Sequence, residues 1–112
     1  MRVLHVDTAR SWRGGQGQVL LSALGMAARG HSVLLACQRG SVLEQRARNA
    51  GVDAVGLRFT GDLSPAAWLG LRSAVRRFRP DVLQLHDPHA LIPGLLAAGR
   101  AIPAVATRRP RA

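Results

Sequence analysis

Short, almost wholly apolar runs alternate with longer segments of helical periodicity along the entire chain, and no other feature of the sequence constrains the fold as strongly. Strands that are covered by helices on both faces read as continuous apolar runs, which is typical of parallel sheets. We therefore predict five strands, which cover residues 2–7, 31–37, 53–57, 81–87 and 103–107.

The intervening segments carry local signals for helix ends. Gly30 stands where a left-handed residue commonly closes a helix, Ser41 with Glu44 three residues later is typical of a capping box, and Ser64-Pro65 is typical of a helix start. The predicted helices cover residues 16–29, 41–49, 64–79 and 88–99. Right-handed crossovers then predict an α/β, Rossmann-like parallel sheet of strand order 3-2-1-4-5, with helices on both faces.

Length and composition limit the classes of protein that this chain can represent. Its 112 residues suffice for one domain. Cys37 is the only cysteine, which excludes an intrachain disulfide and favours a reducing compartment. Asp7 interrupts any signal peptide, and the longest apolar stretch, residues 90–99, is too short to cross a bilayer and contains Pro93. We expect a cytoplasmic protein.

The charge balance favours anionic partners. The formal net charge is +10, and all 16 basic residues are arginine. Most arginines are scattered, which argues against a nucleic-acid partner, and only residues 72–79 and 108–111 form clusters. We interpret the helix face with Arg72, Arg76 and Arg79 as either a solvated face or a contact with anionic lipid at the inner face of a membrane.

Ligands of open α/β sheets bind at the carboxyl ends of the strands, so the candidate residues are those that follow each strand. The segments in question are residues 8–17, 38–41, 59–62, 86–89 and 107–109.

The first of these segments contains Gly14 and Gly15. It fails as a dinucleotide fingerprint because Leu20 replaces the third glycine and Cys37-Gln38 stand where an acid should end the second strand. Two interpretations remain. The glycines form either a tight turn, or a bare backbone at which a phosphate or sugar approaches a helix N-terminus.

The segment after the fourth strand, His86-Asp87-Pro88-His89, has no standard zinc spacing with Cys37, so we expect no metal. His86 is either a ligand-binding histidine or a structural one beside a helix-capping Asp87. His5, in the middle of a strand, is expected to be a satisfied core histidine. Trp12 either stacks on a sugar ring or packs on the first helix.

An ordered set of segments resembles the N-terminal domain of family 4 glycosyltransferases. These segments are W-R-G-G-Q-x-Q-V-L, G-H-S-V-L-L-A-C, R-G-S-V-L-E-Q-R-A, R-F-R-P-D-V-L-Q-L-H-D-P-H-A-L and A-I-P-A-V-A-T-R-R. The resemblance implies half of a GT-B fold, with the domain at residues 1–107 and a basic tail at 108–112 as the expected truncation point. One departure is Gly17, where many relatives have a glutamate.

The resemblance also implies site residues. It assigns His86 as the catalytic candidate, a cleft histidine that hydrogen-bonds sugar hydroxyls. The substrate-binding candidates are Trp12, Arg13, Gly14, Gly15, Gln16, Asp87, Arg108 and Arg109.

The implied function is the acceptor-side half of a retaining glycosyltransferase, which moves a sugar from a nucleotide-sugar donor to a glycan or glycolipid acceptor of the cell envelope. The donor is a substrate, so no cofactor is expected. A C-terminal Rossmann domain would be a necessary partner, which leaves open whether this chain alone is an enzyme. The alternative is a free-standing Rossmann-like module that binds a phosphorylated or nucleotide ligand without catalysis.

Overall fold

The protein is described by a computed structural model for residues 1–10, 12, 14–60 and 65–106. Its five strands form one sheet of order β3-β2-β1-β4-β5, and all neighbouring strands are parallel. The strands are β1 (Arg2–Asp7), β2 (Ser32–Gln38), β3 (Asp53–Leu57), β4 (Val82–Leu85) and β5 (Ala104–Ala106). The predicted strand order and direction are confirmed.

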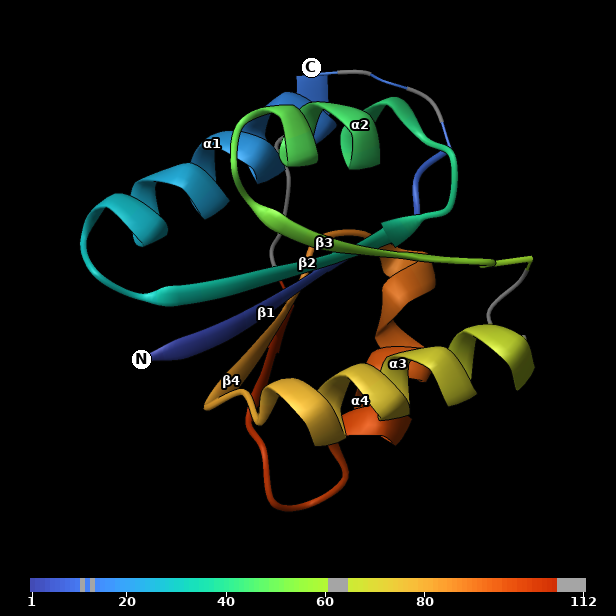
Figure 1. Ribbon diagram of the computed structural model, residues 1–112. Coiled ribbons are helices and arrows are strands. Elements are labelled where there is room, and N and C mark those ends of the chain that lie inside the picture. The colour runs from blue at the N-terminus through green and yellow to red at the C-terminus, as the bar shows by residue number, and fades with distance from the viewer. Residues whose placement is uncertain (11, 13, 61–64, 107–112) are drawn as a thin grey trace.

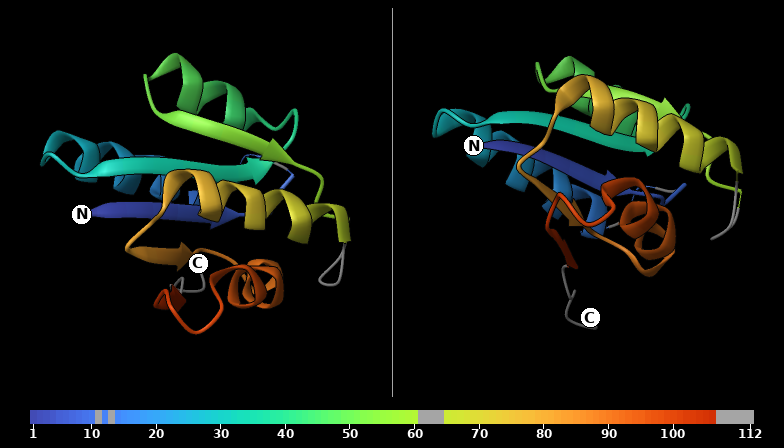
Figure 2. Two further views of the ribbon diagram at one scale, coloured as in Figure 1. Left: turned by 60° about the horizontal axis from the view of Figure 1, so that its bottom comes forward. Right: turned by 90° about the horizontal axis from the view of Figure 1, so that it is seen from below.

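Helices cover both faces of this sheet. Figure 1 shows α1 (Gly14–Ala28) and α2 (Val42–Asn49) on one face, and α3 (Pro65–Phe78) and α4 (Leu91–Ala98) on the other. Figure 2 shows the same layers in two further views, with the strands running side by side between the helices. Each connection therefore returns the chain to the same end of the sheet, which brings the five carboxyl ends to one edge.

Alternation along the strands divides the core into two clusters. On β2, Val33, Leu35 and Cys37 pack with α1 and α2, whereas Ala36 packs with α3 and α4. On β1, Leu4 and Val6 belong to the α3–α4 cluster. Because successive side chains point to opposite faces, His5 and Asp7 lie on the α1–α2 face.

The N-terminus of α2 is capped as predicted, with one change in the partners. Ser41 Oγ accepts a hydrogen bond from the Glu44 amide at 3.2 Å. The Glu44 carboxylate accepts from the Gly40 amide at 2.8 Å, because the Ser41 amide already donates to the Gln38 carbonyl at 3.1 Å. Glu44 also pairs with Arg48 at 3.2 Å. The predicted reciprocal bond is thus shifted by one residue.

The helix predicted over residues 88–99 is interrupted. It consists of a 3-10 turn, η1 (Pro88–Ala90), followed by α4. A continuous α-helix would require the nitrogen of Pro93 to donate to the His89 carbonyl, and proline has no N–H. The chain instead restarts at Leu91, which places Pro93 in the first turn of α4, where no intrahelical donor is needed.

Small residues of α4 face the sheet and large ones face outward. Pro93, Gly94, Ala97 and Ala98 are buried, and a Cβ atom on Gly94 would lie only 2.5 Å from Leu85 Cδ2. The outward positions are Leu91, Ile92, Leu95 and Leu96, which are 40% to 59% exposed. This distribution lets α4 lie unusually close to β4. Within the described ranges, no helix is both long and apolar enough to cross a membrane.

Candidate functional site

The carboxyl ends of β1 and β4 are joined by Thr8 and Asp87. The Thr8 amide donates to Asp87 Oδ1 at 3.0 Å, and the Thr8 hydroxyl donates to Asp87 Oδ2. Asp87 occupies the N-cap position of η1 in an extended conformation, but its side chain makes no capping hydrogen bond. The interpretation of Asp87 as a helix cap is therefore wrong, because both carboxylate oxygens are turned toward the neighbouring strand.

A cavity of about 440 Å³ lies at this edge, and we call it the carboxyl-edge cavity. Its wall combines a carboxylate, a guanidinium, an imidazole and hydroxyl groups with the apolar side chains of Ala9 and Pro88, whereas Phe59 is only 5% exposed. The lining residues are Thr8, Ala9, Arg10, Phe59, Thr60, Asp87, Pro88 and His89. Such a mixture of directed polar groups and apolar surface suits a small ligand that has both hydroxyl groups and a ring.

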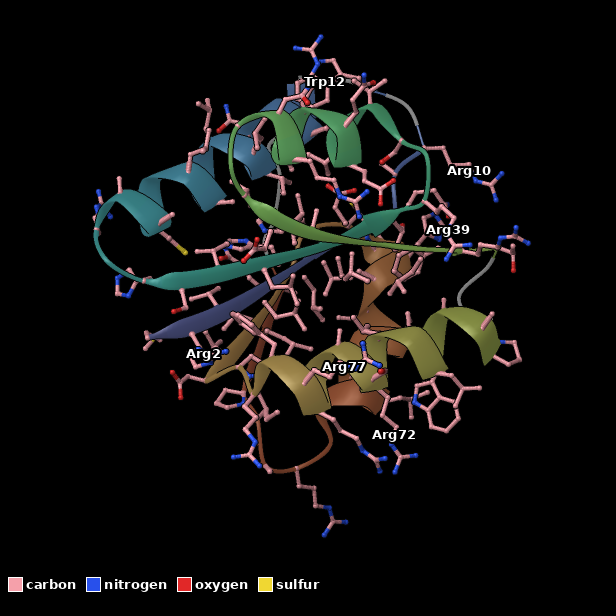
Figure 3. The ribbon with its side chains drawn as sticks, viewed as in Figure 1. Arg2, Arg10, Trp12, Arg39, Arg72 and Arg77 are labelled. Carbon is pink, nitrogen blue, oxygen red and sulfur yellow. The ribbon has the colours of Figure 1, made fainter. Side chains whose placement is uncertain are left out.

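A second, more basic cavity of about 320 Å³ adjoins the first and shares Arg10 and Thr60 with it; we call it the arginine cavity. Its lining residues are Arg10, Gln38, Arg39, Gly40, Ser41, Arg58 and Thr60. Figure 3 shows Arg10 and Arg39 together at this edge, whereas Arg2 lies at the opposite end of the strands.

Hydrogen bonds to Phe59 fix the wall between the two cavities. The side chain of Gln38 donates to the Phe59 carbonyl at 3.0 Å and accepts from the Phe59 amide at 2.8 Å. Arg10 donates to the same carbonyl at 3.3 Å. Gln38 at the end of β2 thus holds Phe59, which follows β3, and Arg10, which follows β1, contacts the same residue.

His86 lies behind the carboxyl-edge cavity rather than among the residues that line it. It is 4% exposed, and its amide donates to the Val6 carbonyl at 2.9 Å. Its Nε2 lies 2.8 Å from Nδ1 of His5, which is fully buried, and the two rings are nearly parallel. One nitrogen of this contact must donate while the other accepts.

The environment of the histidine pair favours the neutral state of His5. Burial, together with a smaller contribution from the neighbouring His86, lowers the pKa of His5 to about 4. The prediction of a satisfied core histidine holds for Nδ1 only, because His5 Nε2 is buried without a hydrogen-bond partner in the described part of the chain.

The double glycine lies in the first turn of α1, so the interpretation as a tight turn is wrong, whereas the position at a helix N-terminus agrees with the second alternative. Gly14 begins the helix, two residues before the predicted start, and Gly15 is helical. Ligand binding at these glycines stays a prediction. The first turn of a helix leaves backbone N–H groups free of intrahelical partners. Gln16, the next candidate, is buried.

Trp12 packs against protein rather than standing free for a sugar ring. Its ring lies under the Arg46 guanidinium, with 4.5 Å from Cζ to the ring centroid. A Cβ atom on Gly17 would lie 3.8 Å from Trp12 Cζ2. Trp12 contacts the α1–α2 core cluster, which favours the packing alternative. The candidates Arg13, Arg108 and Arg109 lie outside the described residues.

The basic face of α3 differs from the prediction in one member. A cavity of about 390 Å³ is lined by Leu69, Arg72, Ser73, Arg76 and Arg77. Arg79 lies beyond the end of α3 with a φ of 54°, so the helical spacing that would align it with Arg76 does not continue that far.

This sheet order, with a cavity across the strand ends, defines a Rossmann-like α/β domain. The chain belongs to the glycosyl transferase 4-like domain family, whose sequence profile matches residues 13–111. No curated protein gave a match in sequence.

Solved structures with similar folds are glycosyltransferases. The match to MurG from Acinetobacter baumannii has a TM-score of 0.73 at 13% identity, and it covers 94% of this chain and 34% of the MurG chain. A glycosyltransferase from Rickettsia africae has a TM-score of 0.75 at 13% identity, with 94% of this chain and 28% of its own covered. HepE from Anabaena, solved with UDP-glucose, has a TM-score of 0.70 at 17% identity, and the match covers 95% of this chain and 28% of the HepE chain. The chain thus spans about a third of these proteins.

Several residues of the site were not singled out from the sequence. Thr8, Arg10 and Phe59 line the carboxyl-edge cavity. The signal that could have identified them is their position directly after β1 and β3, since the segments that contain them were predicted to face the ligand. Their individual roles depend on contacts between segments that the sequence does not specify.

Proposed function

We propose that this chain is the acceptor-side half of a retaining glycosyltransferase, and that the carboxyl-edge cavity holds a sugar of a glycan or glycolipid acceptor. The observation that carries the proposal is the cavity's wall. Asp87, Thr60 and His89 supply polar groups for hydroxyls, and Ala9 and Pro88 supply apolar surface against which a sugar ring can lie. Membership of the glycosyl transferase 4-like domain family supports the same function.

The nucleotide-sugar donor enters this proposal as a substrate, so no cofactor or metal ion is required. A second Rossmann-like domain would bind most of the donor, because transfer needs the donor to be enclosed and water to be excluded. The N-terminus of α1 at Gly14 faces the same strand edge, and its backbone N–H groups favour an anionic phosphate. Gly15 lies beside Gly14 in this turn and supplies a backbone that a ligand can approach closely.

His86 keeps a place in the proposal as a positioning residue. It is buried beside His5 and adjoins Asp87 in the chain. Its hydrogen bonds therefore hold the backbone from which the Asp87 carboxylate reaches the cavity.

A surface on α3 and α4 supports a lipid-linked acceptor at the inner face of a membrane. Leu69 of α3 is 56% exposed, close to Arg72, Arg76 and Arg77, and the outward leucines of α4 are exposed as well. Arginines beside exposed apolar side chains suit an anionic lipid surface.

Saccharide binding tests the proposal directly. In an NMR titration of the 112-residue chain with neutral glycans, amide shifts should concentrate at Thr8, Arg10 and Thr60. Asp87→Asn should weaken binding about tenfold, as expected for the loss of a charge-assisted hydrogen bond. The matched control is Asp53→Asn, on the amino-terminal side of the sheet, and it should leave the affinity unchanged. Equal effects of the two variants, or shifts centred elsewhere, would refute this role of the cavity.

A further inference from the structure

Three arginines follow three neighbouring strands at the same edge of the sheet. Arg10 comes after β1, Arg39 directly follows β2 at Gln38, and Arg58 directly follows β3 at Leu57. The order β3-β2-β1 makes these strands adjacent, so the topology gathers the arginines although they are far apart in sequence. They line the arginine cavity together with Ser41 and Thr60.

Among the described residues that line the arginine cavity, none is acidic. Glu44 is an acidic residue that contacts one of the lining residues, Gly40. Its carboxylate accepts from the Gly40 amide at 2.8 Å and pairs with Arg48 at 3.2 Å. Its charge is therefore balanced within α2 and is not directed at Arg10 or Arg39.

The cavity is organised by its backbone and by one arginine contact. The Arg39 amide donates to the Leu57 carbonyl at 2.8 Å, which fixes the chain at the end of β2. Arg10 uses one guanidinium donor for the Phe59 carbonyl, and a guanidinium has five N–H donors in a rigid plane. The first turn of α2 follows at Val42, with the partial positive charge of a helix N-terminus.

We propose that the arginine cavity binds an oxyanion, of the phosphate-ester class, carried by the acceptor. The inference rests on the proposed function, because the anion would belong to a molecule whose sugar occupies the carboxyl-edge cavity. Arg10 and Thr60 line both cavities, so the two groups of such an acceptor would lie next to each other. Planar guanidinium groups bind phosphate oxygens through paired, charge-assisted hydrogen bonds, which gives both affinity and orientation.

The test is an NMR titration of the 112-residue chain at constant ionic strength, with inorganic phosphate, glucose 6-phosphate and glucose as the probes. Phosphate should shift the amides of Gly40, Ser41 and Thr60. Glucose 6-phosphate should bind at least about tenfold more tightly than glucose, which corresponds to one charge-assisted interaction. Shifts spread evenly over the basic surface would mean that phosphate only screens charge, and would overturn the proposal.

Matched variants separate a built site from general positive charge. Arg39→Gln should weaken phosphate binding about tenfold, and Arg39→Lys should give an intermediate loss, because it keeps the charge but not the planar fork. Arg29→Gln, directly after α1 at an exposed position, removes the same charge outside the cavity and should change binding less than about twofold. Equal losses in Arg39→Gln and Arg29→Gln would overturn the proposal. Arg39 is exposed, so all variants should keep the parent's melting temperature.

The two proposals fail in different ways. Loss of phosphate binding with neutral-glycan binding retained would refute the oxyanion site alone. Retained phosphate binding without any saccharide binding would refute the sugar site of the proposed function, and an oxyanion on an acceptor would then have no basis.

Discussion

The buried histidine pair makes the stability of this fold depend on pH in a calculable way. The pKa of His5 is lowered from 6.5 to about 4 by burial, with a further contribution from His86. As the pH falls below 6.5, the unfolded chain takes up a proton at His5 while the folded chain does not. Stability is therefore lost as the pH falls from 6.5 to 4, and below that range the loss is complete.

The size of the effect follows from the shift. Each pKa unit corresponds to about 1.4 kcal/mol, so His5 alone should contribute a loss of roughly 3 kcal/mol in unfolding free energy at the acid end of this range. At about pH 4.5 most of this loss, about 2 to 3 kcal/mol, should already be present. Urea unfolding at about pH 7.5 and about pH 4.5, followed by circular dichroism, would measure it.

Carboxylates also protonate over this pH range and contribute to the pH dependence of the unfolding free energy. Comparison of matched variants with the parent cancels this contribution. His5→Asn cannot take up the proton, so the difference between the two pH values should shrink by about 2 to 3 kcal/mol relative to the parent. Val33→Ala, which destabilises the same face of the sheet without removing a titratable group, should keep the parent's pH dependence. An unchanged pH dependence in His5→Asn would refute the assignment of the proton to this site.

Two further predictions concern packing and activity. Gly94→Ala should destabilise the fold by about 1 to 3 kcal/mol, because the new methyl group would overlap Leu85. In Gly25→Ala of α1 the new methyl group meets no atom within 4 Å, so this variant should stabilise the fold by about 0.5 to 1 kcal/mol. Thermal unfolding of both variants measures these changes, and a Gly94→Ala variant more stable than Gly25→Ala would contradict the prediction. The 112-residue chain by itself should transfer no sugar from any nucleotide sugar, since a donor needs a second domain to enclose it, and turnover in a coupled nucleotide-release assay would contradict this.

The sheet could be predicted from the sequence because its order depends on few and strong signals. Apolar runs mark the strands, and right-handed crossovers leave little choice in how β1 to β5 connect. Helix ends such as Gly30, with its φ of 90°, were predictable because the backbone conformation itself selects glycine.

The details of the candidate site were less predictable because they depend on contacts between distant segments. The Thr8–Asp87 and His5–His86 hydrogen bonds join residues that are 79 and 81 positions apart. The sequence therefore left two alternatives, a helix-capping Asp87 beside a structural His86, or the cleft histidine that the resemblance implied. The sequence predicts which edge of the sheet carries the site, whereas the partners of each side chain depend on how closely the elements pack.

The close packing of α4 bears on the carboxyl-edge cavity, although Gly94 itself does not line that cavity. A methyl group on Gly94 would overlap Leu85, so we expect it to displace α4 together with the preceding turn, η1, and to shift Asp87 relative to Thr8. A core position about two turns away is therefore expected to influence the width of the carboxyl-edge cavity. Selection for a larger or smaller ligand could act on this core position while every residue that contacts the ligand stays the same.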